Sequence, residues 1–111
     1  MGEPLNLESG DTVATAIRVA RPIYGAAALR ALEESDGILV TVPDSATIDD
    51  GKEIARHEGI FAEPASAASV AFIPELLESG VIDGSDTIVS IITSSGLKTN
   101  DIIRSLSLRR K

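Results

Sequence analysis

The amino-acid sequence predicts an α/β fold in which helices flank a partial parallel sheet in layers. Two runs of residues, 37–43 and 87–93, are almost entirely apolar, which is typical of strands covered on both faces, as in a parallel sheet. Segments of helical composition precede, separate and follow these runs, and the resulting order is helix, strand, helix, helix, strand, helix. A layered α/β domain with parallel strands therefore accounts for the whole pattern.

Length and composition indicate one folded domain. The chain has 111 residues, of which 43% are hydrophobic and 24% charged, and both fractions are near the average of folded proteins. We expect residues 1–111 to form a single domain and residues 1–11 to be a loose polar arm. The chain has no cysteine, which excludes thiol nucleophiles and zinc-thiolate sites and fits a reducing compartment. Because it also shows neither a signal-peptide pattern nor an apolar span, we expect a cytoplasmic protein.

The balance of charges argues against two classes of partner. Acidic residues outnumber basic ones by 17 to 10, and aromatic residues make up 3% of the chain. Nucleic acids and anionic membranes bind clustered Lys and Arg, and unpaired bases stack on aromatic side chains. We therefore expect neither a nucleic acid nor a membrane as a partner.

The first helix is expected over residues 22–35. Pro22 suits the first turn of a helix, because its missing N–H would have no partner there, and residues 26–34 are mostly strong helix formers that end before Gly37. The preceding residues, 12–19, are too apolar to remain in water. We therefore expect them to dock against another surface.

A second helix is expected after the first strand. Asp44 is expected to cap its free N–H groups, while Arg56 and His57 near its end complement the helix dipole. Gly59 is the expected stop. Gly51 lies inside this helix, where glycine costs about 1 kcal/mol relative to alanine, so we expect a neighbouring backbone to pack closely there.

Pro64 is expected to begin a third helix. Residues 65–69 give this helix a face of small side chains that can lie close to other backbone or to a ligand. Pro74 removes one helical hydrogen bond and costs about 3 kcal/mol in a regular helix. A kink is therefore expected near residues 70–74, with Gly80 as the stop.

The second strand, 87–93, is followed by a short final helix that Thr99 or Asn100 is expected to cap. Two parallel strands alone leave long apolar edges without partners, which folded proteins avoid. We therefore expect further strands from another segment or from another copy of the chain.

Hydroxyl groups gather where the second strand ends, at Thr93, Ser94 and Ser95, which Gly96 follows. Ligands of open parallel sheets bind beyond the carboxyl ends of the strands, where these groups can bond a polar ring or an anion. Ser-Ser-Gly is also a common ordinary turn. Taken alone, the feature leaves both interpretations open.

Three segments of the sequence resemble the carboxyl-terminal part of the threonine synthase family in order and approximate spacing. They are Thr-Ser-Ser-Gly-Leu-Lys at residues 93–98, a stretch containing Glu-Pro-Ala-Ser-Ala-Ala at residues 58–68, and residues 12–19. The resemblance covers residues 12–101, and related pyridoxal-phosphate enzymes of the tryptophan synthase β fold share looser versions. It implies that the sheet is part of that larger fold and that pyridoxal phosphate is the cofactor of the complete enzyme. It also implies a lyase of threonine biosynthesis that converts O-phosphohomoserine to threonine and phosphate.

The resemblance implies roles for five residues. Thr93 is implied to hydrogen-bond the pyridine nitrogen of the cofactor, and Ser94, where the family often has glycine, to lie beside it. Glu63 is similar to the acidic residue near the cofactor ring, although the alternative is a carboxylate stabilised by the helix dipole. Thr15 and Arg18 match the segment that approaches the substrate cleft, although a surface position is commoner for an arginine.

The Schiff-base lysine and the glycine-rich phosphate loop of that family do not occur in the sequence. We therefore assign no catalytic residue and no metal ligand, and expect the chain alone to be inactive. His57 is expected to be a surface residue favoured by the helix dipole, and Lys98 to be solvated. The missing amino-terminal part of the enzyme, or a second copy across the open sheet edge in a homo-oligomer, is the expected partner.

Two alternatives remain open. The chain can be a stand-alone interaction or regulatory domain without activity, which pairs through its open sheet edge. It can also be a segment of a related threonine or serine dehydratase or of a β-replacement enzyme. Binding of pyridoxal phosphate by the chain alone is left open as well.

Overall fold

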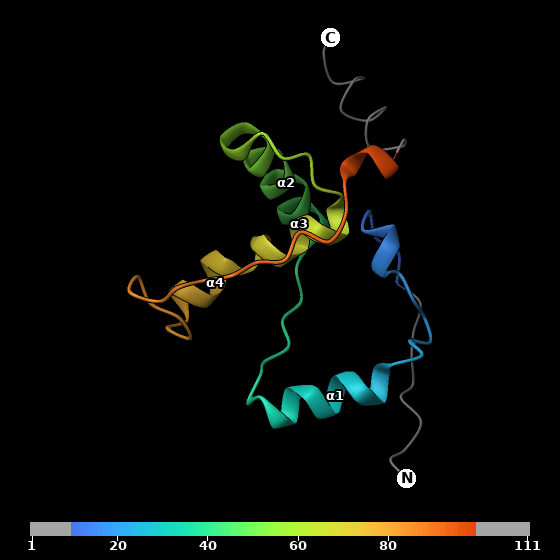
Figure 1. The fold of residues 1–111 in the computed structure, drawn as a ribbon, viewed down its shortest axis with the longest axis vertical. Helices are drawn as coiled ribbons and strands as arrows, with labels where there is room; N and C mark the ends of the chain where they lie inside the picture. Colours follow the sequence, from blue (N-terminus) through green and yellow to red (C-terminus); the bar gives the residue numbers. More distant parts are fainter. Residues whose placement is uncertain (1–9, 100–111) are drawn as a thin grey trace.

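A computed structural model describes residues 10–99 of the chain. This part contains four α-helices and two short 3₁₀ helices, η1 and η2, and its fold is drawn in Figure 1. In chain order they are η1 (Thr15–Ile17), α1 (Gly25–Glu34), α2 (Asp44–Glu58), α3 (Pro64–Ala71), α4 (Ile73–Glu78) and η2 (Gly96–Lys98). The helix expected from Thr99 or Asn100 onward, and most of the expected arm, lie outside the described residues.

The expected helix ends are mostly confirmed. Gly59 adopts a left-handed φ of 68° and ends α2. Gly80, just after α4, also has a left-handed φ, of 73°. Pro64 is the first residue of α3, and the expected kink is a break at Phe72 between α3 and α4. The first helix differs, because α1 begins at Gly25 and Pro22 lies in the turn before it.

The expectation that Asp44 caps the second helix is wrong. Pro43 occupies the N-cap position of α2, and Asp44 is the first residue inside the helix. From there its carboxylate accepts hydrogen bonds from Thr12 and Val13. Asp44 therefore bonds a segment that is distant in sequence and does not cap its own helix.

The packing of α2 on α3 forms the centre of the described structure. A Cβ atom on Gly51 would lie 3.5 Å from the Cβ of Ala67, which is fully buried. The close neighbour expected at Gly51 therefore exists, although it is a methyl group rather than backbone. The buried hydrophobic residues, Ala14, Ala62 and Ala67, are all alanines, so this core removes little apolar surface from water.

The described residues do not form the expected parallel sheet. Between residues 10 and 99, the β pairing consists of one isolated antiparallel bridge, Ala62 to Ser95. The two apolar runs are irregular, and Leu39 and Val89 in them are 75% and 83% exposed. A buried parallel strand needs partners on its edges and cover on both faces, and the described chain supplies neither.

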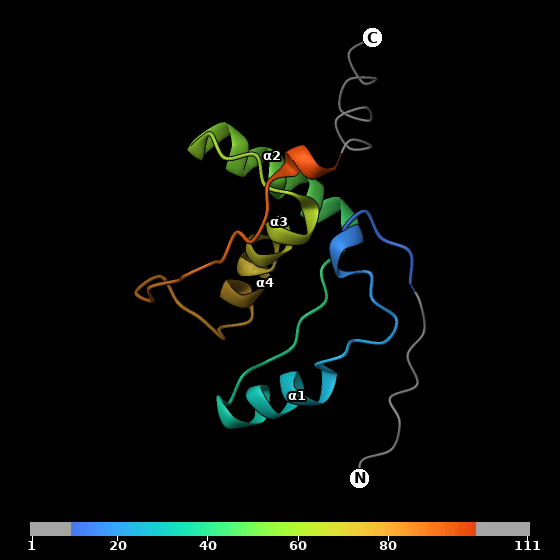
Figure 2. The ribbon, with the colours of Figure 1, turned by 45° about the vertical axis from the view of Figure 1, so that its right-hand side comes forward.

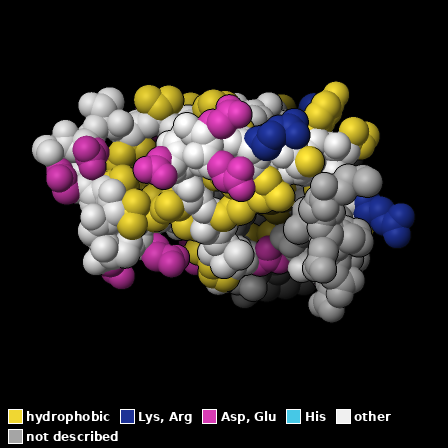
Figure 3. All heavy atoms as spheres, turned by 90° about the horizontal axis from the view of Figure 1, so that it is seen from below, with side chains coloured by type: hydrophobic (Ala, Val, Ile, Leu, Met, Phe, Trp, Pro, Cys, Tyr) yellow, Lys and Arg dark blue, Asp and Glu magenta, His cyan; other side chains and the backbone are white. Residues whose placement is uncertain are grey.

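Helix α1 lies apart from the other three α-helices in both ribbon views (Figures 1 and 2). It has no buried residue, and Ile23 and Tyr24 just before it are also exposed. Seen from below, the surface carries hydrophobic side chains among acidic ones (Figure 3). Much apolar surface is thus left uncovered. Within the described range, the helices are too short or too polar to cross a membrane.

Candidate functional site

The turn at residues 93–98 lies against the chain just before α3. The Gly96 N–H donates to the Phe61 carbonyl oxygen over 2.7 Å, and the Glu63 N–H donates to the Ser94 carbonyl oxygen over 3.2 Å. These bonds flank the bridge between Ala62 and Ser95. Two segments that are distant in sequence are therefore fixed side by side by their main chains.

Gly96 is required here by close approach. A Cβ atom on this residue would lie 2.7 to 2.8 Å from three atoms of the Phe61 ring, which is inside van der Waals contact. The ring covers the buried Gly96, and the chain turns on into η2. Because glycine has no Cβ atom, the Phe61 ring can pack directly against the backbone of the turn.

Ser66 in α3 holds the first residues of the turn. Its hydroxyl oxygen accepts the Ser94 N–H over 2.9 Å and lies 2.9 Å from the Thr93 hydroxyl oxygen. The side chain is buried, with 1% of Ser66 exposed. Sequence reasoning missed this residue, although it lies within the Glu-Pro-Ala-Ser-Ala-Ala motif and on the face of small side chains.

Ser69, one helical turn further on, fastens the same segment at a second point. Its hydroxyl donates to the Ser66 carbonyl oxygen over 2.7 Å and lies 3.3 Å from the Ile91 carbonyl oxygen. The Ser90 hydroxyl in turn donates to the Ser69 carbonyl oxygen over 2.9 Å. Residues 90–94 are thus held along α3 by hydroxyl groups, although no sheet encloses them.

A wide hollow of about 480 Å³ opens at the turn. Its lining combines the apolar side chains of Ile60, Phe61, Ile92 and Leu97 with the hydroxyls of Thr93, Ser94 and Ser95. An apolar wall with a few polar groups is the usual lining of a small-molecule site. The arrangement can accommodate a small molecule that has apolar surface and a hydrogen-bonding group.

The three residues expected to contact a cofactor come together in the structure. Thr93 and Ser94 line the hollow, and the Glu63 main chain is bonded to Ser94. Glu63 is 8% exposed and holds the N-cap position of α3, but its carboxylate makes no capping hydrogen bond. Its charge at a helix N-terminus is nevertheless favoured by the dipole.

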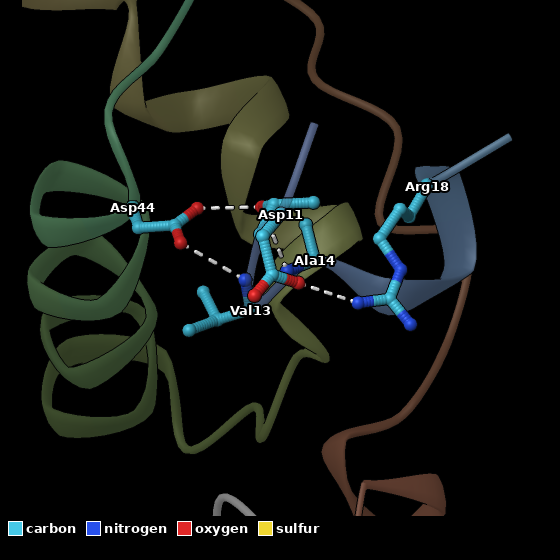
Figure 4. Close-up of polar contacts among 6 residues, drawn as sticks. Asp11, Val13, Ala14, Arg18 and Asp44 are labelled. Carbon is cyan, nitrogen blue, oxygen red and sulfur yellow. Dashed lines mark hydrogen bonds and ion pairs between the residues drawn. The ribbon is translucent and has the colours of Figure 1, made fainter. Parts of the chain in front are cut away.

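Thr15 and Arg18, the residues expected to contact substrate, lie elsewhere. Arg18 pairs with the exposed Asp11, with 2.6 Å between the guanidinium and carboxylate atoms (Figure 4). Arg18 borders a separate hollow with residues 10–12, and Thr15 is exposed on η1. The described residues therefore do not bring these two side chains to the Thr93 turn.

The segment before η1 is docked on α2 through Asp44. The Thr12 hydroxyl donates to Asp44 Oδ1 over 2.5 Å and the Val13 N–H donates to Oδ2 over 2.9 Å (Figure 4). The bond from Thr12, followed by that from Val13, lowers the pKa of Asp44 below its ordinary value. The expected docking of residues 12–19 is confirmed for its first residues, while Ile17 and Val19 remain exposed.

The hollow offers partners for the pyridine ring of pyridoxal phosphate, but the described residues offer no lysine placed to react with its aldehyde group. The hollow offers a hydroxyl at Thr93 and an aromatic wall at Phe61. The lysines in the described range lie elsewhere: Lys52 pairs with Asp49 over 2.8 Å, and the exposed Lys98 is outside the lining of the hollow. In the same range, no group of acidic residues and histidines is arranged to hold a metal ion.

Comparison with known proteins gives a consistent picture. Residues 1–94 match the family described as pyridoxal-phosphate dependent enzyme. The chain is 46% identical over 91 residues to a threonine synthase of Methanocaldococcus jannaschii, covering 82% of the chain and 22% of that protein. It is 40% identical over 96 residues to one of Bacillus sp. strain ULM1, covering 86% and 27%. With a Mycobacterium leprae threonine synthase it shares 37% over 101 residues, covering 91% and 28%. The chain thus spans about a quarter of the length of these relatives.

Proposed function

This chain belongs to the pyridoxal-phosphate dependent enzyme family, and we propose that it forms the wall of a threonine synthase against which the cofactor ring lies. The observation that carries the proposal is the Thr93 hydroxyl, which Ser66 holds at the edge of an apolar hollow. The sequence identity to three threonine synthases supports the choice of enzyme. The reaction of the complete enzyme would convert O-phosphohomoserine and water to threonine and phosphate.

Pyridoxal phosphate, when bound, supplies an electron sink for reactions next to an amino group. In this proposal the Thr93 hydroxyl would donate a hydrogen bond to the ring nitrogen, and Ser94 would border the ring. A neutral donor leaves the ring nitrogen unprotonated, in contrast to a carboxylate partner. Glu63, nearly buried and bonded to Ser94 through its main chain, would lie near the ring. The lysine and the phosphate loop would come from another part of the enzyme.

We propose that Arg18 and Thr15 belong to the substrate side of the complete site. Both partners of the ion pair are exposed: 47% of the Arg18 side chain and 95% of the Asp11 side chain are accessible. Exposed ion pairs contribute only about 0 to 1 kcal/mol. An incoming phosphate or carboxylate can therefore replace Asp11 at little cost.

We also propose that residues 37–43 and 87–93 become parallel strands of a larger tryptophan synthase β-like sheet. Their exposed apolar side chains support this, since burial of each contributes up to about 2 kcal/mol. The remaining strands would come from the rest of the enzyme or from a second copy in a homo-oligomer.

The lack of cysteine supports a cytoplasmic location.

A chimeric enzyme tests the proposed activity. The section of the M. jannaschii threonine synthase that matches this chain over 91 residues is replaced by the corresponding residues of the chain. The chimera should bind pyridoxal phosphate and release phosphate and threonine from O-phosphohomoserine. The unaltered relative, treated in parallel, is the control.

Three outcomes would contradict the proposal. A folded chimera that binds the cofactor but releases no threonine would remove the assigned activity. Release of ammonia and a keto acid in place of threonine would favour a dehydratase. Covalent attachment of pyridoxal phosphate to a lysine of the isolated chain, made stable by borohydride, would show that the chain carries its own reactive lysine.

A further inference from the structure

Ser66 carries a polar hydroxyl in one of the most buried positions of the described chain. It is 1% exposed, so its proton and its oxygen have to find partners inside the protein. The oxygen accepts the Ser94 N–H over 2.9 Å. An amide can only donate, so this bond uses a lone pair of Ser66 and leaves the hydroxyl proton to be placed.

The position of that proton follows from the remaining contacts. Among the described residues, the acceptor within hydrogen-bonding distance of the Ser66 hydroxyl is Thr93 Oγ1, at 2.9 Å. If Thr93 donated to Ser66, the buried Ser66 proton would lack a partner, which is unfavourable for a group shielded from water. Donation from Ser66 to Thr93 gives the buried Ser66 proton a partner and is the favoured direction.

This direction leaves the Thr93 proton free. Thr93 lies at the edge of the hollow and is exposed, so its hydroxyl can turn toward a ligand. A hydroxyl that accepts one hydrogen bond also becomes a better donor in the next, because chains of hydrogen bonds polarise one another. The pair acts as a donor relay from Ser66 through Thr93 to the hollow.

We propose that Ser66 is a positioning residue that keeps the Thr93 hydroxyl a hydrogen-bond donor, so that the site selects a ring nitrogen that carries no proton. The inference rests on the proposed function, in which Thr93 meets the cofactor ring. It goes further in assigning the state of that nitrogen to a buried serine that does not line the hollow. Ser66 acts on the ligand only through Thr93.

Ser69 is the matched control on the same helix. Its hydroxyl also fastens the segment, through the Ser66 and Ile91 carbonyl oxygens, but it makes no contact with Thr93. A Ser69→Ala variant removes a fastening point and leaves the Ser66–Thr93 relay intact. It separates loss of support from loss of proton orientation.

The test uses the chimeric holoenzyme loaded with pyridoxal phosphate labelled with ¹⁵N at the ring. Its nitrogen chemical shift reports the hydrogen bond without any turnover. Thr93→Val should move the shift toward that of a ring nitrogen without a hydrogen bond. Ser66→Ala should move it in the same direction, by a smaller amount, and weaken cofactor binding by roughly twofold to tenfold, the range for one hydrogen bond. Ser69→Ala should leave the shift unchanged.

The double variant Ser66→Ala/Thr93→Val decides whether Ser66 acts through Thr93. Its nitrogen shift should equal that of Thr93→Val alone. An unchanged shift in Ser66→Ala, or an additional shift in the double variant, overturns the proposed relay. An unchanged shift in Thr93→Val overturns the placement of Thr93 at the ring, and with it the proposed function.

Folding is followed separately on the full 111-residue chain. Amide exchange at Ser94 should accelerate in Ser66→Ala, because its N–H loses its acceptor. It should remain slow in Thr93→Val, which leaves that acceptor in place. Fast exchange throughout the chain in Ser66→Ala would indicate unfolding. In that case Thr93→Ser decides the question in the holoenzyme. It keeps the relay, so its nitrogen shift should match the unaltered protein, and a shift equal to that of Thr93→Val overturns the inference.

Discussion

Thr12 and Asp44 are 32 positions apart in the sequence, and the Thr12 hydroxyl donates to Asp44 Oδ1 over 2.5 Å. With the Val13 N–H bond to the other carboxylate oxygen, this contact fastens the segment before η1 to the start of α2. Both bonds stabilise the ionised carboxylate more than the protonated carboxyl group, which is why they lower the pKa of Asp44.

The docking of residues 12–14 should therefore depend on pH. The pKa of Asp44 is lower in the folded than in the unfolded chain, so its stabilising contribution is present above the ordinary value of about 3.9. It is lost as the pH falls through the lowered folded value. Amide exchange at Val13, corrected for its intrinsic pH dependence, should show less protection in that acidic range. Asp44→Asn should reduce protection already near neutrality.

Asp83 provides the control for this pH effect. Its pKa is also lowered, first by the Ser85 hydroxyl and then by the Ser85 N–H, within the loop after α4. Asp83→Asn should leave exchange at Val13 unchanged. Equal loss of protection in both variants would mean that the effect is general and does not arise at Thr12 and Asp44.

Gly96→Ala should destabilise the turn by about 1 to 3 kcal/mol, the usual cost of overpacking. The added methyl would lie 2.7 to 2.8 Å from the Phe61 ring, which would have to move. Urea unfolding of the chimera measures the loss. Phe61→Leu introduced together with Gly96→Ala should recover part of it. A double variant less stable than the sum of the two single changes would contradict the proposed clash.

Gly51 within α2 and Gly59 at its C-cap should respond to alanine with opposite signs. Gly51→Ala should stabilise the chain by up to about 1 kcal/mol, because alanine favours a helix and its methyl meets Ala67 at an ordinary 3.5 Å. Gly59→Ala should destabilise it by about 1 kcal/mol or more, because φ is 68° there. Thermal unfolding of both variants checks the signs, and a destabilising Gly51→Ala would contradict the described packing of α2 on α3.

The apolar runs should drive self-association of the isolated chain. Leu39 and Val89 are 75% and 83% exposed, so a charge at either position removes apolar surface that a partner would bury. Leu39→Lys and Val89→Lys should lower the average mass measured by size exclusion with light scattering. Leu77→Lys on α4 is the control and should have less effect. A strictly monomeric unaltered chain would refute the prediction.

Local signals predicted the helices well. Pro64, Gly59 and Gly80 act on their own backbone, so their effects could be inferred without the rest of the molecule. The apolar runs could not be placed, because a strand exists only with its neighbours and the described chain offers none. The role of Asp44 was missed for the same reason, since its partner Thr12 is distant in sequence.

The candidate site was predicted in part. Thr93, Ser94 and Glu63 were singled out by sequence, and the structure brings them together beside α3. Ser66 was missed, because a serine in a helix of small residues gives no sign of a hydroxyl partner 27 positions away. Arg18 does not lie at the turn in the structure. Its position could not be predicted, because the partner of an exposed arginine depends on which carboxylate the fold places nearest to it.

The contact between Gly51 and Ala67 has a consequence for how the sequence can diverge. The two helices meet with room for one additional methyl group at Gly51, and Ala67 opposite it is fully buried. A residue larger than alanine at position 51 would bring more atoms against Ala67 on α3, the helix that carries Ser66 and Ser69. Among descendants of this protein, positions 51 and 67 should therefore change together, with one growing only where the other shrinks.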